Sequence, residues 1–239
     1  MGEFKDYSIL RSTLLIIMCF SANASFGAGI VLSVLSVASI RKVKQPSELA
    51  FASIPLIFAI QQFSEGLLWL SITDPIYGSL KQVSTYTFLF FAQIVWPIWL
   101  PLALLLLTKN VKAVSIHKIF VLFGVIVSLY LTYCLIYFDV EAKVVGQHIA
   151  YLQNYPLALK PYVWVFYGTA TVLPAFFSKI KWMWILGMVI LISYIITNIF
   201  YRDYVVSVWC FFASVISIVV VTFMYQINPA KKSPNKLFH

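Results

Sequence analysis

The stretch 57–70 places one carboxylate, that of Glu65, among apolar residues. Gln61 and Gln62 precede it by four and three residues and Trp69 follows it by four, so a helix would carry all of these side chains on one side. An ionised carboxylate at bilayer depth costs about 2.5 to 3.5 kcal/mol on insertion scales. This side is therefore expected to face protein, water or a ligand rather than lipid, and its amide, indole and carboxyl groups could orient a small polar solute.

The composition is that of an integral membrane protein. Of 239 residues 62% are hydrophobic and 10% are charged, against roughly 25% charged in a soluble domain, and the mean hydropathy is +0.91. The lipid bilayer is the expected partner. A net charge of +9 would suggest a nucleic-acid partner in a soluble chain, but in a membrane protein it indicates which loops are cytoplasmic, and no nucleic acid is expected.

Seven apolar stretches predict an all-α integral membrane protein, with seven transmembrane helices in a single domain over residues 1–239. A bilayer requires about 20 apolar residues per helix. The first stretch is interpreted as a helix rather than a signal peptide, because no small-residue cleavage pattern follows it. The predicted spans are 12–40, 49–71, 86–107, 119–138, 161–177, 182–200 and 205–225.

The basic residues predict an orientation. Eleven of the 17 lysine and arginine residues fall in the first, third and fifth loops and the C-terminal tail, where the only acidic residue is Glu48. An excess of lysine and arginine marks the cytoplasmic side, so the N-terminus is expected outside and the C-terminus inside. Residues 139–159, the longest connection, would then lie outside and are a candidate lid.

Polar side chains from five helices are predicted to meet at one level in the outer half of the bundle. Glu65 would lie about 9 Å below the outer end of its span. The inner halves of the same helices are almost wholly apolar, so a cavity open to the outside is expected. An interfacial aromatic belt with amides joining helices would explain the other residues without a ligand, but not Glu65. The candidate ligand-binding residues are Cys19, Ser21, Asn23, Gln61, Gln62, Glu65, Trp69, Gln93, Trp96, Tyr194, Asn198, Trp209 and Cys210.

Two patterns concern the packing of the helices. Ser21, Ser25, Gly29 and Ser33 form a stripe of small residues, which is typical of a close helix contact. A shift of the chain by 137 residues aligns Gln61 with Asn198 and the basic first loop with the basic fifth loop. Identity is near chance, but three helices, a linking helix and three more in the same orientation form the 3+1+3 parallel-repeat plan of small transporters.

Several chemistries lack the residues that they need. No lysine falls within a predicted span, which excludes a retinal Schiff base. His117, His148 and His239 are assigned to two loops and the tail, so no multi-histidine zinc site is expected. No phosphate-binding glycine loop occurs. No metal site is predicted, and no cofactor can be named.

The three cysteines, Cys19, Cys134 and Cys210, are all expected toward the outer side. Buried free thiols that behave as small apolar side chains are the favoured interpretation. A disulfide between two of them, or a thiolate metal site with Glu65, is the alternative.

Three segments carry a resemblance to a known family: MCFSANASF (18–26), QQFSEGLLW (61–69) and WCFFAS (209–214). From Met18 onward the chain resembles an uncharacterised bacterial family of multi-spanning membrane proteins that opens with Met-Cys-Phe/Trp-Ser-Ala and carries Gln/His-Gln-x-x-Glu-x-x-x-Trp in its second span. The resemblance implies a multi-pass protein of the bacterial cytoplasmic (inner) membrane and implies no activity. The 17 residues before Met18 depart from the family pattern. If translation started at Met18, Cys19 could become the N-terminal residue. The matching positions are Cys19, Ser21, Gln62, Glu65, Trp69, Trp209 and Cys210.

The predicted function is the binding or transport of a small solute through an outward-facing polar cavity centred on Glu65. One titratable group among amides, hydroxyls and aromatics suits the orientation of a ligand, whereas catalysis usually needs an acid–base pair or an activated nucleophile. Burial should raise the pKa of Glu65 unless Arg202 or a bound cation lies nearby, and proton coupling would follow. Two alternatives stay open: an intramembrane enzyme acting on a lipid or isoprenoid through Cys19 and Glu65, and a non-catalytic subunit or assembly factor.

Overall fold

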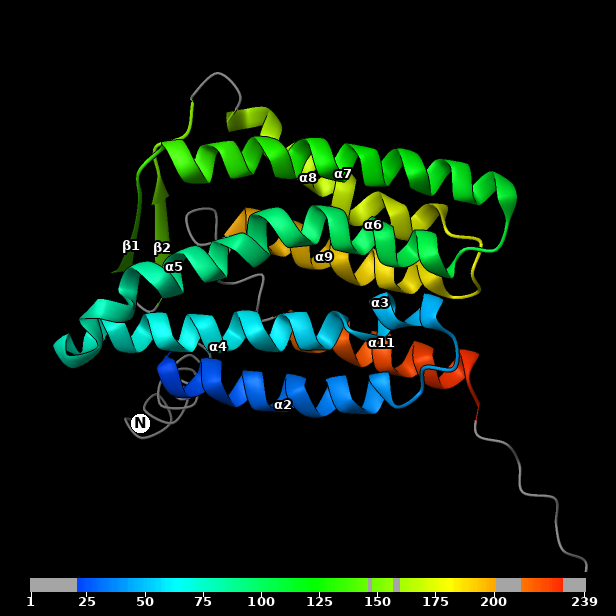
Figure 1. The fold of residues 1–239 in the computed structure, drawn as a ribbon, viewed down its shortest axis with the longest axis horizontal. Coiled ribbons are helices and arrows are strands. Elements are labelled where there is room, and N and C mark those ends of the chain that lie inside the picture. Colours follow the sequence, from blue (N-terminus) through cyan, green and yellow to red (C-terminus); the bar gives the residue numbers. More distant parts are fainter. Residues whose placement is uncertain (1–20, 146–147, 157–159, 201–211, 230–239) are drawn as a thin grey trace, which may run out of the picture.

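The computed structural model describes residues 21–145, 148–156, 160–200 and 212–229. Its helices lie side by side along one long axis, and the connections gather at the two ends of the bundle (Figure 1). In chain order the elements are α2 (Ala22–Ile40), η1 (Pro46–Glu48), α3 (Leu49–Ala52), α4 (Ile54–Thr73), η2 (Pro75–Leu80), α5 (Lys81–Leu89), the π-helical turn η3 (Phe90–Val95), α6 (Trp96–Leu107), α7 (Val111–Tyr137), β1 (Val140–Val145), β2 (His148–Gln153), α8 (Lys160–Phe177), α9 (Met183–Phe200) and α11 (Ala213–Ile227).

The helices have the length and composition of membrane spans. Within the described chain, the four stretches long and apolar enough to cross a membrane are Ala22–Ile40, Pro46–Thr73, Pro75–Leu107 and Val111–Tyr137. Three shorter apolar helices follow, over Val165–Phe177, Met183–Thr197 and Ala213–Ile227. The prediction of a mainly helical protein with membrane-length apolar helices is confirmed, and the seven crossings and the internal repeat stay predictions. Residues 12–20 and 205–211 of the predicted spans lie outside the described residues.

Helix α7 begins at Val111, ahead of the predicted span. Asn110 caps it, because its side-chain oxygen accepts a hydrogen bond from the Ala113 backbone N–H at 3.2 Å. No glycine or proline interrupts the following turns, so the helix continues through His117. The assignment of His117 to a loop was wrong: its side chain is fully buried, and its ring nitrogens lie 2.7 Å from Ala113 O and 3.2 Å from Pro174 O.

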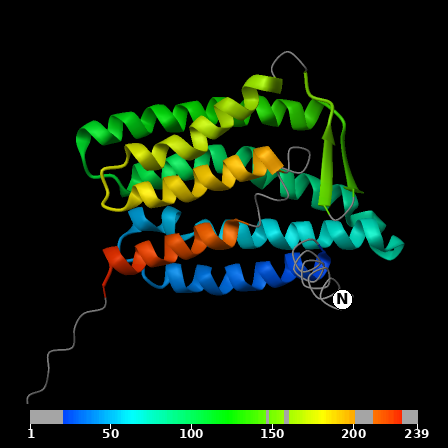
Figure 2. The ribbon, with the colours of Figure 1, turned by 180° about the vertical axis from the view of Figure 1, so that it is seen from behind.

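The connection after α7 contains an antiparallel β-hairpin, which the all-α prediction missed. β1 and β2 pair from Val140 opposite Gln153 to Val145 opposite His148. Valine in β1 favours an extended strand. The hairpin lies at the end of the bundle where α5 begins and α7 ends, here called the hairpin end (Figures 1 and 2). The opposite end, where α6 and α11 end, is called the basic end because its turns and the start of α7 carry Arg41, Lys42, Lys44, Lys109, Lys112, Lys179 and Lys181.

Helix α4 runs through the middle of the bundle and packs along α2. Gly29 of α2 lies under the ring of Phe63, and Gly66 of α4 lies under the ring of Phe26. A Cβ atom at Gly66 would lie 2.8 Å from the Phe26 ring, so each glycine makes room for an aromatic side chain of the other helix. Ser25 is buried in the same contact face. Gly29 of the predicted small-residue stripe thus lies in a close helix contact, whereas Ser21 caps α2 and Ser33 bonds to Gly29 O of its own helix.

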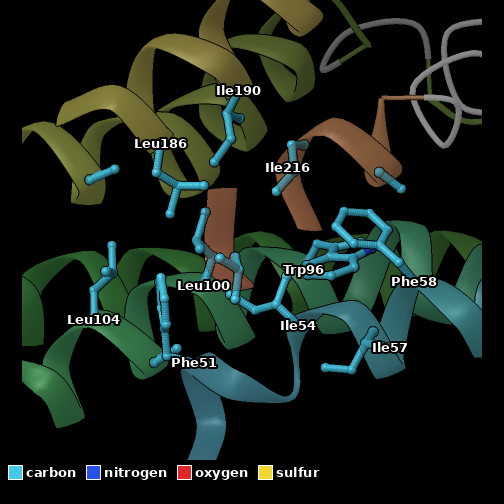
Figure 3. Packing of buried hydrophobic residues seen from close by; sticks show 14 of the residues in the cluster. Phe51, Ile54, Ile57, Phe58, Trp96, Leu100, Leu104, Leu186, Ile190 and Ile216 are labelled. Carbon is cyan, nitrogen blue, oxygen red and sulfur yellow. The ribbon is translucent and has the colours of Figure 1, made fainter. Parts of the chain in front are cut away.

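An apolar cluster fills the bundle on the side of the basic end. It joins α3, α4, α6, α9 and α11, which supply side chains that face one another across the bundle axis (Figure 3). Apart from Trp96 and Tyr167, whose polar atoms are hydrogen-bonded within the bundle, the side chains of this cluster carry no hydrogen-bonding groups, so the cluster itself offers little to hydrate a solute. Members of the cluster are Phe51, Ile54, Ile57, Phe58, Leu100, Leu104, Leu186, Ile190 and Ile216.

A polar contact, the Glu48–Asn228 clasp, joins two distant segments at the basic end. Oε2 of Glu48 accepts hydrogen bonds from the backbone N–H groups of Lys44 and Gln45 at 2.8 and 3.3 Å. It also accepts one from the side-chain amide of Asn228 at 2.8 Å. Nζ of Lys44 lies 3.4 Å from Pro229 O. The clasp therefore ties the segment before α4 to the end of α11.

The clasp gives a testable prediction for stability. Asn228→Ala should lower the free energy of unfolding by about 1.5 to 3 kcal/mol, because it removes a hydrogen bond to a buried charged group. The control is Asn154→Ala, which changes an exposed asparagine. Denaturant titration of the purified protein compares the two variants, and equal effects would show that the clasp does not stabilise the fold.

Candidate functional site

Helix α4 buries the polar residues around which the site was predicted. Glu65 is only 3% exposed, and Gln61, Gln62 and Trp69 are buried with it. The indole N–H of Trp96 donates a hydrogen bond to Oε1 of Gln61 at 2.8 Å. The side-chain amide of Gln61 on α4 is thus held against Trp96 on α6, and this contact joins two of the predicted site residues.

A π-helical turn, η3, presents Gln93 at the start of α6. Pro97 lacks a backbone N–H, so the regular i to i−4 ladder cannot continue through this region. Two backbone carbonyl groups of the turn instead accept hydrogen bonds from side-chain hydroxyls of other helices. Ala92 O accepts one from Tyr167 at 2.5 Å, and Ile94 O accepts one from Ser128 at 2.8 Å. Single π-turns within α-helices occur frequently at functional sites.

Gln93 joins the helices to the hairpin. The hydroxyl of Tyr155 donates to Oε1 of Gln93 at 2.8 Å. Nε2 of Gln93 donates in turn to Oε1 of Gln153 at 3.0 Å. Nε2 of Gln153 is buried and has no hydrogen-bond partner among the described residues. A buried amide donor without an acceptor is costly, so the chain of hydrogen bonds ends in a group suited to an acceptor oxygen of a ligand or water.

Tyr155 acts in this network as a neutral donor. Burial raises the pKa of Tyr155, and the nearby thiol of Cys134 adds to the shift. The phenol therefore keeps its proton at physiological pH. Cys134 is a buried free thiol, as predicted.

The hairpin packs against α4 and α5 at the hairpin end of the bundle. Tyr151 of β2 stacks on Phe88 of α5, with ring centroids 5.0 Å apart and planes at 1°. Ile149 lies in one apolar cluster with Leu68 and Trp69 of α4. Trp69, predicted to face the ligand, thus contacts the hairpin. The two strands of the candidate lid therefore pack against α4 and α5.

The seating of the hairpin should depend on pH through His148. Burial lowers the pKa of His148 from its usual 6.5. Below about pH 6.5 the imidazole of His148 therefore binds a proton more readily in the undocked segment than in the docked hairpin. The docked hairpin is thus most stable above that pH and loses stability as the pH falls below it. Hydrogen exchange of β2 amides, corrected for intrinsic rates, should quicken at about pH 5.5 relative to about pH 7.5. His148→Gln should flatten this difference, and an unchanged pH response in that variant would contradict the assignment.

The remaining predicted site residues do not all join this network. Ser21 caps α2, where its hydroxyl oxygen accepts from the Ala24 backbone N–H at 3.2 Å. Asn23 is exposed, and Tyr194 of α9 lies beside Gly168 of α8. Four residues, namely Cys19, Arg202, Trp209 and Cys210, lie outside the described residues, as does the side chain of Asn198.

Sequence reasoning missed Gln153 and Tyr155 as site residues. The available signal was their position in the one long connection that carries several polar residues. It also assigned no role to the hydroxyls of Tyr167 and Ser128, which hold the π-turn. Within the described chain, no group of three or more histidine, cysteine or acidic side chains could hold a metal ion.

The chain belongs to a family of unknown function (DUF6629), which matches residues 18–235. This range agrees with the resemblance to an uncharacterised family from Met18 onward. No curated protein and no solved structure matches the chain.

Proposed function

We propose that this protein binds a small polar solute in the hairpin half of the bundle, at a site centred on Glu65, and transports it across the membrane. The observation that carries the proposal is the hydrogen-bonded chain from Tyr155 through Gln93 to Gln153, which ends in a buried amide donor with no partner among the described residues. The site lies beneath an ordered hairpin rather than at an open surface. It offers both donors and acceptors, so it suits a solute with both.

The kinds of groups in the site favour binding over catalysis. The described polar residues supply amides, an indole, a neutral phenol and the carboxyl group of Glu65, and the buried thiol of Cys134 lies near Tyr155. Acid–base catalysis needs a second titratable partner, and covalent catalysis needs an activated nucleophile. The thiol of Cys19, which would serve the enzymatic alternative, lies outside the described residues. Cys19→Ser should leave solute binding intact and would abolish a thiol-dependent reaction.

The proposed orientation places the hairpin end outside the cell and the basic end in the cytoplasm of a bacterium, across the inner membrane. The excess of lysine and arginine at the basic end supports it. Lys143→Cys on β1 should react with a membrane-impermeant maleimide in intact cells, and Lys112→Cys on α7 only after permeabilisation. The reverse labelling pattern would overturn the orientation.

Transport would require the apolar cluster at the basic end to open at times. Proline residues mark where helices can bend, and Pro97 and Pro101 lie in α6, directly after the π-turn that carries Gln93. Pro174 lies inside α8. Bending at these positions would let the two halves of the bundle open alternately around the site.

A screen with a matched pair of variants tests the proposed function. Purified protein is tested by thermal shift with a panel of amino acids, polyols, nucleosides and polyamines, and hits are tested for uptake into proteoliposomes. Gln93→Leu should abolish the shift given by any hit, because it removes both links of the network. Thr222→Val, on the exposed face of α11, is the control and should retain it. A shift that survives Gln93→Leu would place binding elsewhere, and a panel without any hit would count against solute binding.

A further inference from the structure

The turn between α8 and α9 has a backbone conformation that does not suit its residue. Met183 N donates to Ile180 O at 3.1 Å, which closes a four-residue turn with Trp182 at the third position. Trp182 has φ 68°, the left-handed region, and it is the one non-glycine residue with positive φ in the described chain. Turns of this kind place glycine at the third position, because a Cβ atom is strained there. A tryptophan at such a strained position points to a use for its side chain.

The side chains of this turn form an exposed basic and aromatic surface. Nζ of Lys181 lies 5.5 Å from the centre of the Trp182 ring. Trp182 is 47% exposed and Trp184, in the first turn of α9, is 53% exposed. Lys179 and Lys181 are exposed, and the described residues supply no carboxylate partner for either. The turn and the start of α9 thus carry two exposed lysines without a carboxylate partner among the described residues and two exposed indoles, all at one end of the bundle.

We infer that this turn binds the phosphate headgroup of an anionic phospholipid. Lysine ammonium groups attract the phosphate, and tryptophan rings favour the level where headgroups meet acyl chains. The indole of Trp182 is 47% exposed and lies near the ammonium group of Lys181. The site lies at the basic end, away from Gln93 and Glu65, and does not depend on the proposed function.

Lipid binding is measured by native mass spectrometry of the full-length protein, titrated with phosphatidylglycerol or phosphatidylcholine. The wild type should bind phosphatidylglycerol in preference. The double variant Lys179→Gln/Lys181→Gln should bind it about 25-fold more weakly, since each basic residue near an anionic surface contributes about fivefold. The control Lys81→Gln/Lys143→Gln, at the hairpin end, should bind it as the wild type does. Equal losses of phosphatidylglycerol affinity in both double variants, or no loss in Lys179→Gln/Lys181→Gln, would contradict the proposed lipid site.

Trp182→Gly separates lipid binding from folding. Glycine adopts positive φ without strain, so the unfolding temperature in phosphatidylcholine should stay the same or rise while affinity for phosphatidylglycerol falls. A lower unfolding temperature would show instead that the indole serves packing. Soluble glycerol phosphate should compete poorly, and full competition would identify a free phosphate rather than a lipid as the ligand.

Discussion

Gly124→Ala is expected to prevent α6 and α7 from packing, with a loss of about 3 kcal/mol or more in the free energy of unfolding. A Cβ atom at Gly124 would lie 1.9 Å from Pro97 O and 2.7 Å from its carbonyl carbon. Both atoms belong to the backbone, so no side-chain rotation relieves the overlap. Pro101, four residues further along α6, has no N–H to donate to this carbonyl. The carbonyl therefore faces α7, and only glycine lets α7 approach it.

The matched control for this substitution is Gly27→Ala. Gly27 lies in α2, and a Cβ atom there would meet nothing within 4 Å. Its free energy of unfolding should stay the same or rise by up to about 1 kcal/mol, because alanine favours a helix over glycine. Denaturant unfolding and the yield of monodisperse protein measure both variants. If the two variants had the same free energy of unfolding, the inference that Gly124 is needed for α7 to approach α6 would be refuted.

Glu65→Gln is expected to reduce solute affinity by tenfold or more, roughly 1.5 to 3 kcal/mol for a hydrogen bond to a charged group. Glutamine keeps the size of the side chain and replaces its carboxyl group by an amide that cannot ionise, so folding should change less than binding. Isothermal titration with a solute found in the panel measures the affinity. If the solute is coupled to protons, the pH dependence of uptake should vanish in the same variant.

Glu141→Gln provides the control for charge at the hairpin end. Glu141 lies on β1 and pairs with Lys143 at 2.9 Å, with about half of each side chain exposed. Such exposed pairs contribute 0 to about 1 kcal/mol, so neither stability nor affinity should change much. If solute affinity fell equally in Glu65→Gln and Glu141→Gln, the loss would be a general effect of charge. If solute affinity were unchanged in Glu65→Gln, Glu65 would not lie at the centre of the site.

The helices could be predicted from the sequence because length and hydropathy alone select membrane-spanning helices. Their boundaries were less predictable, since single caps decide them, as Asn110 does for α7. The hairpin was not predicted: its strands are short, and they dock through contacts such as Tyr151 on Phe88 that are distant in the chain. The π-turn depends likewise on hydroxyls from other helices.

Part of the candidate site could also be predicted, because helix boundaries give the depth of each polar residue in the bundle. Gln61 and Trp96 follow from placing polar groups at equal depth, and their side chains do meet. Gln153 and Tyr155 could not be placed, because depth along a helix says nothing about a segment that folds back over the bundle. Polarity alone also did not separate a helix cap such as Ser21 from a residue of the network.

The position of a bound solute tests the central claim most directly. A crystal structure with a solute from the panel should show it under the hairpin, within hydrogen-bond distance of Gln153 Nε2 and against Gln93, Gln61 or Glu65. A solute on the lipid-facing surface or at the basic end, with the Gln93 network unchanged, would contradict the account.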